Sequence, residues 1–81
     1  MKGAVIPLPA DAPVVGEVYR HYKGDKYQVK LLVLHSNDDV WMVVYEPLYE
    51  HPDAPFFTRP LSEWRELVKW EEQTVERFTL A

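Results

Sequence analysis

Gly-Glu-Val-Tyr-Arg-His-Tyr-Lys-Gly-Asp-Lys-Tyr-Gln-Val occupies residues 16–29, and this run predicts a strand, a tight turn and a second strand. The turn falls at Lys23-Gly24-Asp25, because Gly24 accepts a positive φ without a clash at Cβ. Three tyrosines are interleaved with cationic side chains and a histidine over the same residues. Groups that both stack and hydrogen-bond at this density indicate a recognition surface, whereas nothing in the run indicates a reaction.

Further strands follow this hairpin. The second strand continues to His35, and strict alternation places on one of its faces Tyr27, Val29, Leu31, Val33 and His35. Short polar residues then predict a turn at 36–39. The remaining strands are expected at 40–45, 56–59 and 74–80, which makes the chain mainly β.

One segment has a helical rather than an alternating period. Leu61, Trp64 and either Leu67 or Val68 recur at helical spacing, and Ser62 occupies the position of an N-cap. We therefore expect one short helix or 3-10 turn at about residues 63–68.

Length and composition limit the chain to one small domain. It has 81 residues, of which 47% are hydrophobic and 14% aromatic, and this supplies a single core. Pro7, Pro9 and Pro13 interrupt the first stretch of chain. We therefore expect a flexible N-terminal arm at 1–13 and one domain at 14–81.

The composition also excludes several classes of protein. There are no cysteines, which removes disulfides, thiolate metal sites and a cysteine nucleophile, and fits a reducing cytoplasm. No run approaches the ~20 apolar residues that cross a bilayer, so no membrane partner is expected. The net charge of −4 argues against broad DNA binding, because such binding depends on many Lys and Arg contacts.

An ordered series of short motifs resembles a known family. The first hairpin has the form Gly-x-Val-Tyr-Arg-His-Tyr-Lys-Gly-x-x-Tyr-x-Val, and the later motifs are His35-Ser36, Val43-Val44-Tyr45, Leu48-Tyr49, Arg59-Pro60-Leu61 and Arg77-Phe78. An ordered series is more specific than a single motif. This one is similar to DUF1653, a bacterial domain of unknown function. The resemblance implies a small SH3-like β roll or barrel and brings no assigned activity.

Three places depart from the family pattern. They are Asn37-Asp38, where Glu-Thr is usual, Phe57, where Trp is usual, and Glu76, where Pro is usual. These residues lie in turns or at an aromatic packing position. They therefore bear on the details of a ligand more than on the fold.

The polar residues that the resemblance retains are the candidate ligand-binding positions. Together with the neighbouring Tyr22, they are Arg20, His21, Lys23, His35, Tyr45 and Arg59. Cationic groups beside aromatic rings suit an anion or a flat polar ligand, such as a nucleotide, RNA or a peptide. We therefore expect a monomeric cytoplasmic binding module without a cofactor, in which Arg20 and Arg59 are paired anion ligands.

Two other functions stay open. One is a small enzyme that acts on a nucleotide or a phosphate ester, with His21 or His35 as the general acid or base. The other is a structural or assembly domain, whose sign would be a dimer in solution and an exposed apolar patch around Trp41, Trp70 and Phe56.

A metal site is not expected. His21 and His35 supply two imidazoles, whereas even an open zinc site normally has three protein ligands. His51 is the third histidine of the chain, and it lies in a proline-rich loop without tight ligand spacing.

Overall fold

The first hairpin forms as the sequence predicts. In the computed structural model, which describes residues 7–50 and 53–81, β1 (Val18–His21) pairs antiparallel with β2 (Lys26–His35). Gly24 has a φ of 112° in the connecting turn, a conformation that glycine adopts without steric cost. The backbone N–H of His21 donates to the carbonyl oxygen of Asp25 at 2.7 Å and closes the turn.

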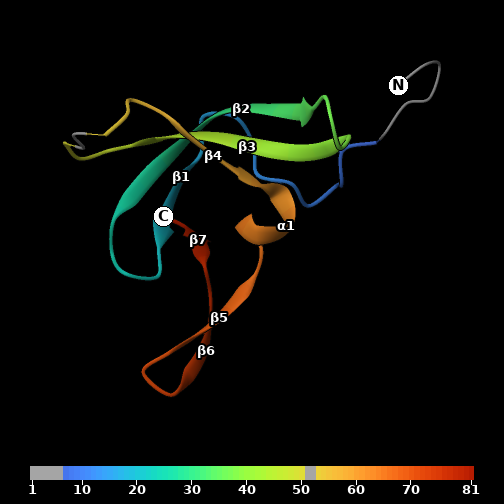
Figure 1. Cartoon of the computed structure of the whole chain (residues 1–81). Helices are drawn as coiled ribbons and strands as arrows, with labels where there is room; N and C mark the ends of the chain where they lie inside the picture. Colours follow the sequence, from blue (N-terminus) through green and yellow to red (C-terminus); the bar gives the residue numbers. More distant parts are fainter. Residues whose placement is uncertain (1–6, 51–52) are drawn as a thin grey trace.

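Seven strands form two antiparallel sheets over the described residues. β3 (Val40–Pro47), β4 (Phe57–Pro60) and β7 (Phe78–Leu80) complete a five-stranded sheet of order β4-β3-β2-β1-β7. β5 (Leu67–Trp70) and β6 (Gln73–Glu76) form a separate hairpin, which extends away from the main sheet in Figure 1. The mainly β prediction is confirmed. Within residues 7–50 and 53–81 the sheet does not close, so the predicted barrel is wrong: β4 and β7 are its edges and do not pair.

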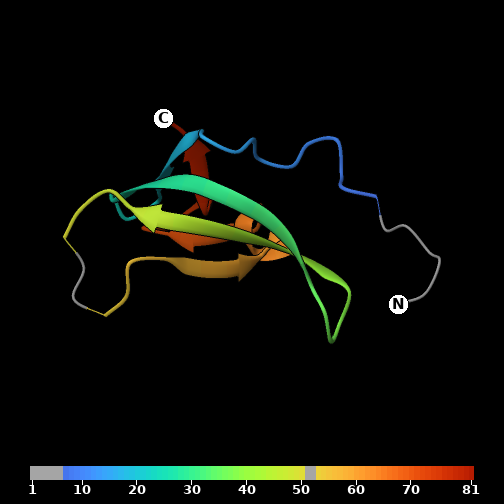
Figure 2. The ribbon, with the colours of Figure 1, turned by 90° about the horizontal axis from the view of Figure 1, so that it is seen from above.

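The sheet is strongly bent. Figure 2 shows β7 running steeply across the direction of β3 and β4. As a result the two edge strands face each other across the core, and Cζ of Arg59 in β4 lies 5.9 Å from the ring centroid of Phe78 in β7. This bend brings together residues that are far apart both in the sequence and in the order of the strands.

The predicted helix is displaced. α1 spans only Leu61–Trp64, follows Pro60, and packs against β3 and β4, whereas residues 67–70 form strand β5. The reason is that the apolar spacing does not mark one buried face. Leu61 and Trp64 are buried, but Leu67 is 61% exposed. Val68 pairs with Val75 in the hairpin instead of continuing a helix.

The expected last strand is divided in two at Arg77. β6 pairs with β5, whereas β7 pairs with β1. Arg77 connects the two sheets through its backbone, because its N–H donates to Glu66 at 3.0 Å and its carbonyl accepts from Tyr22 at 2.9 Å. The C-terminal end therefore joins the two sheets and fixes the base of the hairpin.

A β-bulge at Lys30 changes the faces of β2. Val29 pairs with Tyr45, and Leu31 pairs with Val44, so Lys30 is the additional residue. Val29 is fully buried, whereas Leu31 is 55% exposed and Leu32 packs against the core. The prediction that Val29, Leu31 and Val33 share a face is therefore wrong, because alternation restarts after the bulge.

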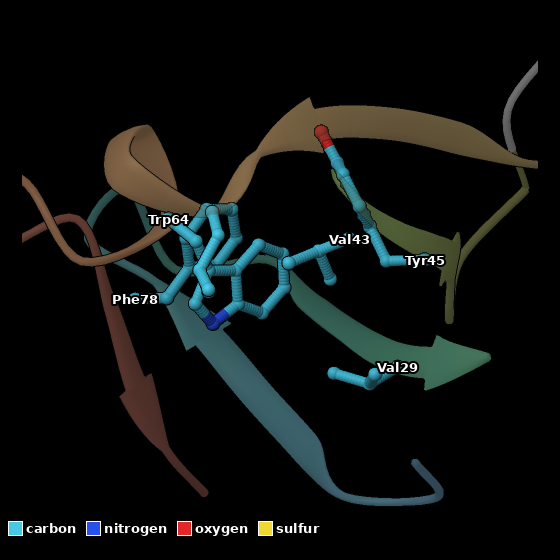
Figure 3. Close-up of a cluster of buried hydrophobic side chains, with 6 residues drawn as sticks. Val29, Val43, Tyr45, Trp64 and Phe78 are labelled. Atoms are coloured by element: carbon cyan, nitrogen blue, oxygen red, sulfur yellow. The ribbon is translucent and has the colours of Figure 1, made fainter. Parts of the chain in front are cut away.

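The core is small and largely aromatic. Its buried members are Val29, Val43, Tyr45, Leu61, Trp64 and Phe78. Trp64 and Phe78 stack almost parallel, with centroids 3.8 Å apart, as Figure 3 shows. Tyr45 packs edge-on against Trp64 at 5.1 Å and adds a third ring. The bent sheet encloses these rings together with α1.

The described part of the predicted arm contacts the domain. Residues 1–6 lie outside the described residues. The carbonyl oxygen of Pro7 accepts a hydrogen bond from Nε1 of Trp41 at 3.1 Å, and Asp11 forms an ion pair with Arg65. Ala12 packs against the core, and Pro13 is buried. The boundary at residue 14 and the flexibility of the arm stay predictions.

Candidate functional site

Two basic side chains from separate strands contact the ring of Phe78, and two further cations lie near His21. His21, at the end of β1, packs edge-on against this ring with centroids 5.2 Å apart. Arg59 from β4 lies over the same ring. Arg77 immediately precedes Phe78, and Lys23 lies in the turn after β1. We refer to His21, Lys23, Arg59 and Arg77 as the basic cluster.

Three cationic side chains act on the charge of His21. Burial lowers the pKa of its imidazole, and the charges of Arg59, Arg77 and Lys23 lower it further, against the smaller opposite influence of Asp25. Burial disfavours any charge, but the part of the shift that comes from the three cations indicates a position where an anion is attracted. The cluster therefore attracts negative charge while His21 itself is neutral.

The two arginines are held by carboxylates at their outer ends. Nη1 of Arg59 donates to Glu63 at 3.2 Å, and Nη2 of Arg77 donates to Glu66 at 2.6 Å. Among the described residues, Nε of Arg59 and Nε of Arg77 are buried and have no hydrogen-bond partner. Since a guanidinium carries five N–H donors, each arginine is oriented by one carboxylate and still has unused donors.

A shallow groove adjoins the basic cluster at His21. It has a volume of about 230 Å³ and is lined by Arg20, His21, Tyr22, Trp70, Val75, Glu76 and Thr79. Tyr22 and Trp70 pack edge to face with centroids 5.2 Å apart, and Nζ of Lys23 lies 5.8 Å from the Tyr22 ring. We call this the Trp70 groove. It separates the β5–β6 hairpin from β1 and β7.

The structure brings together only part of the predicted site. His21, Tyr22, Lys23 and Arg59 lie in or beside the basic cluster. Arg20 is exposed and lines the Trp70 groove with His21, whereas Arg59 lies over Phe78, and the pairing of these two arginines on one anion stays a prediction. Arg77, which is not among the predicted site residues, lies near His21.

Two predicted site residues lie elsewhere. His35 is at the far end of β2, where its Nδ1 accepts from the N–H of Asn37 at 3.3 Å and lies 3.9 Å from Asp38. Tyr45 is only 6% exposed and belongs to the core. Neither residue is part of the basic cluster, and a ligand-binding role for either one stays a prediction.

Sequence reasoning missed three residues of this region. Arg77 and Phe78 were in the ordered motif series, which was the available signal, but Arg77 was placed in the middle of a strand. Trp70 is expected from the sequence only in the assembly patch, because only the β5–β6 pairing places it next to Tyr22. The position of Arg77 at the junction of the two sheets could not be read from periodicity.

Three further features bear on function: a metal site, a membrane-spanning helix and the expected assembly patch. Within 7–50 and 53–81, no group of three or more His, Cys, Asp or Glu side chains is arranged to hold a metal ion, and His51 lies outside this part. No helix in the same residues has the length and apolar character needed to span a membrane. Trp41, Trp70 and Phe56, the residues of the expected assembly patch, lie on β3, on β5 and just before β4.

Fold and site together define a small, open antiparallel β domain with basic and aromatic side chains between its two sheet edges. Residues 17–80 match the family described as "Protein of unknown function (DUF1653)", and the chain belongs to this family. The structure is similar to the crystal structure of a DUF1653 protein from Bordetella bronchiseptica. The two sequences are 38% identical, the TM-score is 0.76, and the match covers 82% of this chain and 85% of the other. No curated protein matches the chain.

The lowered pKa of His21 predicts a pH-dependent stability. A histidine of ordinary pKa 6.5 that the fold keeps neutral binds its proton more readily in the unfolded chain. The free energy of unfolding should therefore fall as the pH drops below about 6.5, until folded His21 is itself protonated. Urea denaturation at several pH values between about 5 and 8 measures the slope.

Two variants test whether His21 causes this pH dependence. His21→Gln should lose the part of the pH dependence of unfolding free energy that His21 contributes. His35→Gln, changed at the far end of β2, should retain it. Equal slopes for the wild type and His21→Gln would contradict the assignment.

Proposed function

We propose that the domain is a binding module for an anion and that the basic cluster is its binding site. The observation that carries the proposal is that His21 and Arg59, from separate strands, contact one ring, that of Phe78, and that Arg77 lies close enough to act on the charge of His21. Arginine forks suit carboxylate and phosphate oxygens, which they bind with parallel hydrogen bonds. We further propose a monomeric cytoplasmic protein whose bent sheet is an open form of an SH3-like roll.

The ion pairs of the cluster do not argue against this function. Glu63 and Glu66 are half exposed, so their attraction to the arginines is weakened by solvent. The side chains of Arg59 and Arg77 are 27% and 20% exposed, which leaves them accessible to a ligand. Each carboxylate therefore serves to orient an arginine toward the position of the anion.

The test is an NMR titration with inorganic phosphate. Phosphate should raise the pKa of the His21 imidazole, because a bound anion stabilises the protonated form. Arg77→Gln should weaken phosphate binding by at least about tenfold, the effect of losing a hydrogen bond to a charged group. Circular dichroism and a thermal melt establish that the variant is folded at the titration temperature.

Arg65→Gln is the matched control. It also removes an arginine from an ion pair, with Asp11, but this pair lies outside the basic cluster. It should leave phosphate binding as in the wild type. If phosphate shifts no resonance of His21, or if both variants lose binding equally, the cluster is not an anion site.

One observation favours a second function. A neutral imidazole beside two guanidinium groups has the composition of a phosphate-ester hydrolysing site, with His21 as the general base. Turnover of a nucleotide or of a phenyl phosphate ester, lost in His21→Gln and bell-shaped with pH, would distinguish an enzyme from a module that only binds.

A further inference from the structure

The Trp70 groove and the basic cluster share His21, so one ligand can occupy both. His21 packs against Phe78 on the side of the cluster and against Tyr22, with centroids 4.4 Å apart, on the side of the groove. The lining of the groove is mostly apolar, because Tyr22, Trp70 and Val75 contribute to it beside the charged Arg20 and Glu76. If the anionic group of a ligand is bound to the basic cluster, the rest of that ligand can therefore lie in the Trp70 groove.

The indole ring of Trp70 is partly exposed to solvent. It is 39% exposed although it contacts Tyr22, and it is held on the β5–β6 hairpin through its pairing with Gln73. A flat ring that stays accessible on a fixed hairpin is suited to stacking with a planar group. Stacking of a nucleobase on such a side chain strengthens binding by about fivefold to 150-fold.

Size and charge limit the ligand to a single nucleotide. The groove has a volume of about 230 Å³, less than the roughly 300 to 1,000 Å³ of pockets that enclose a drug-sized ligand, so it has room for one base while the phosphate lies outside it on the basic cluster. Glu71 and Glu72 form the turn after Trp70, and Glu76 lines the groove. Their carboxylates would repel any further phosphates of an RNA or DNA strand that continued past the base.

We infer that this region binds a 5′-mononucleotide, with its phosphate on the basic cluster and its base against Trp70. The inference rests on the proposed anion-binding function and adds the class of ligand. Inorganic phosphate contacts the cluster alone, whereas a nucleoside contacts the groove alone. The two halves of the site are therefore separable by experiment.

The experiment compares AMP, adenosine and inorganic phosphate by NMR and by isothermal titration. AMP should bind at least about tenfold more tightly than phosphate and should shift both His21 and the indole resonance of Trp70. Trp70→Leu should bring the ratio of AMP to phosphate affinity close to one. Leu67→Ala is the matched control, because Leu67 is exposed on the same hairpin and does not line the groove.

The outcomes separate the two claims. In one outcome, phosphate shifts the His21 resonances while AMP binds no more tightly than phosphate and leaves the Trp70 resonance unchanged. In that case the inference of a mononucleotide ligand is wrong, and the proposed anion-binding function is retained. If neither compound shifts His21, both are wrong. Equal affinity of adenosine and AMP would overturn the inference, as would an oligonucleotide that binds more tightly than AMP.

Discussion

Trp64→Ala is expected to lower the free energy of unfolding by about 3 to 5 kcal/mol, the usual cost of truncating a buried large aromatic residue. Trp64 is 2% exposed, stacks on Phe78 and contacts Tyr19 and Tyr45 edge-on. The rings of Trp64 and Phe78 are nearly parallel, with an interplanar angle of 8°. The total free energy of unfolding of a native domain is about 5 to 15 kcal/mol. This variant should therefore be close to unfolded.

Two further variants show whether the effect comes from the stack. Trp64→Phe keeps a ring against Phe78 and removes the indole N–H, which is buried without a hydrogen-bond partner among the described residues. It should cost clearly less than Trp64→Ala. Trp70→Ala truncates an exposed indole and should cost about 1 kcal/mol or less. Denaturant titrations that rank Trp70→Ala with Trp64→Ala would show that the core is misassigned.

Leu32→Lys is expected to destabilise the domain by about 2 to 4 kcal/mol, whereas the adjacent Leu31→Lys should cost less than about 1 kcal/mol. The difference follows from the bulge at Lys30. Leu32 packs against the core, and a lysine there loses this packing and brings an ammonium group out of water. Leu31 is 55% exposed on the outer face, where a lysine remains solvated.

This pair of variants tests the faces of β2 directly. Strict alternation from Val29 places Leu31 in the core and predicts the opposite ranking. Thermal and urea denaturation of both variants measure the ranking, and the difference between two adjacent positions cancels changes in net charge. A larger loss for Leu31→Lys would mean that β2 has no bulge in solution.

The fold explains which of the predicted site residues lie together. His21, Lys23 and Arg59 recur in the motif series, and the bend of the sheet brings them together. Arg20 and His35 come from the same motifs, but Arg20 is exposed and lines the Trp70 groove, and His35 lies at the far end of β2. A motif preserves the identity of a residue and does not record the face or end of the sheet on which it lies.

Interactions between neighbouring residues specify the turn at Gly24, the β1–β2 hairpin and the mainly β class, and the ordered motifs identify the family. Turn chemistry and alternation act over a few residues, so they can be read locally. Contacts between distant segments specify the bulge at Lys30, the strand at 67–70, the division at Arg77 and the open sheet. Each of these depends on which distant segment pairs with the chain at that point. The basic cluster belongs to the second group, because its members meet only when β4 and β7 face each other across the aromatic core.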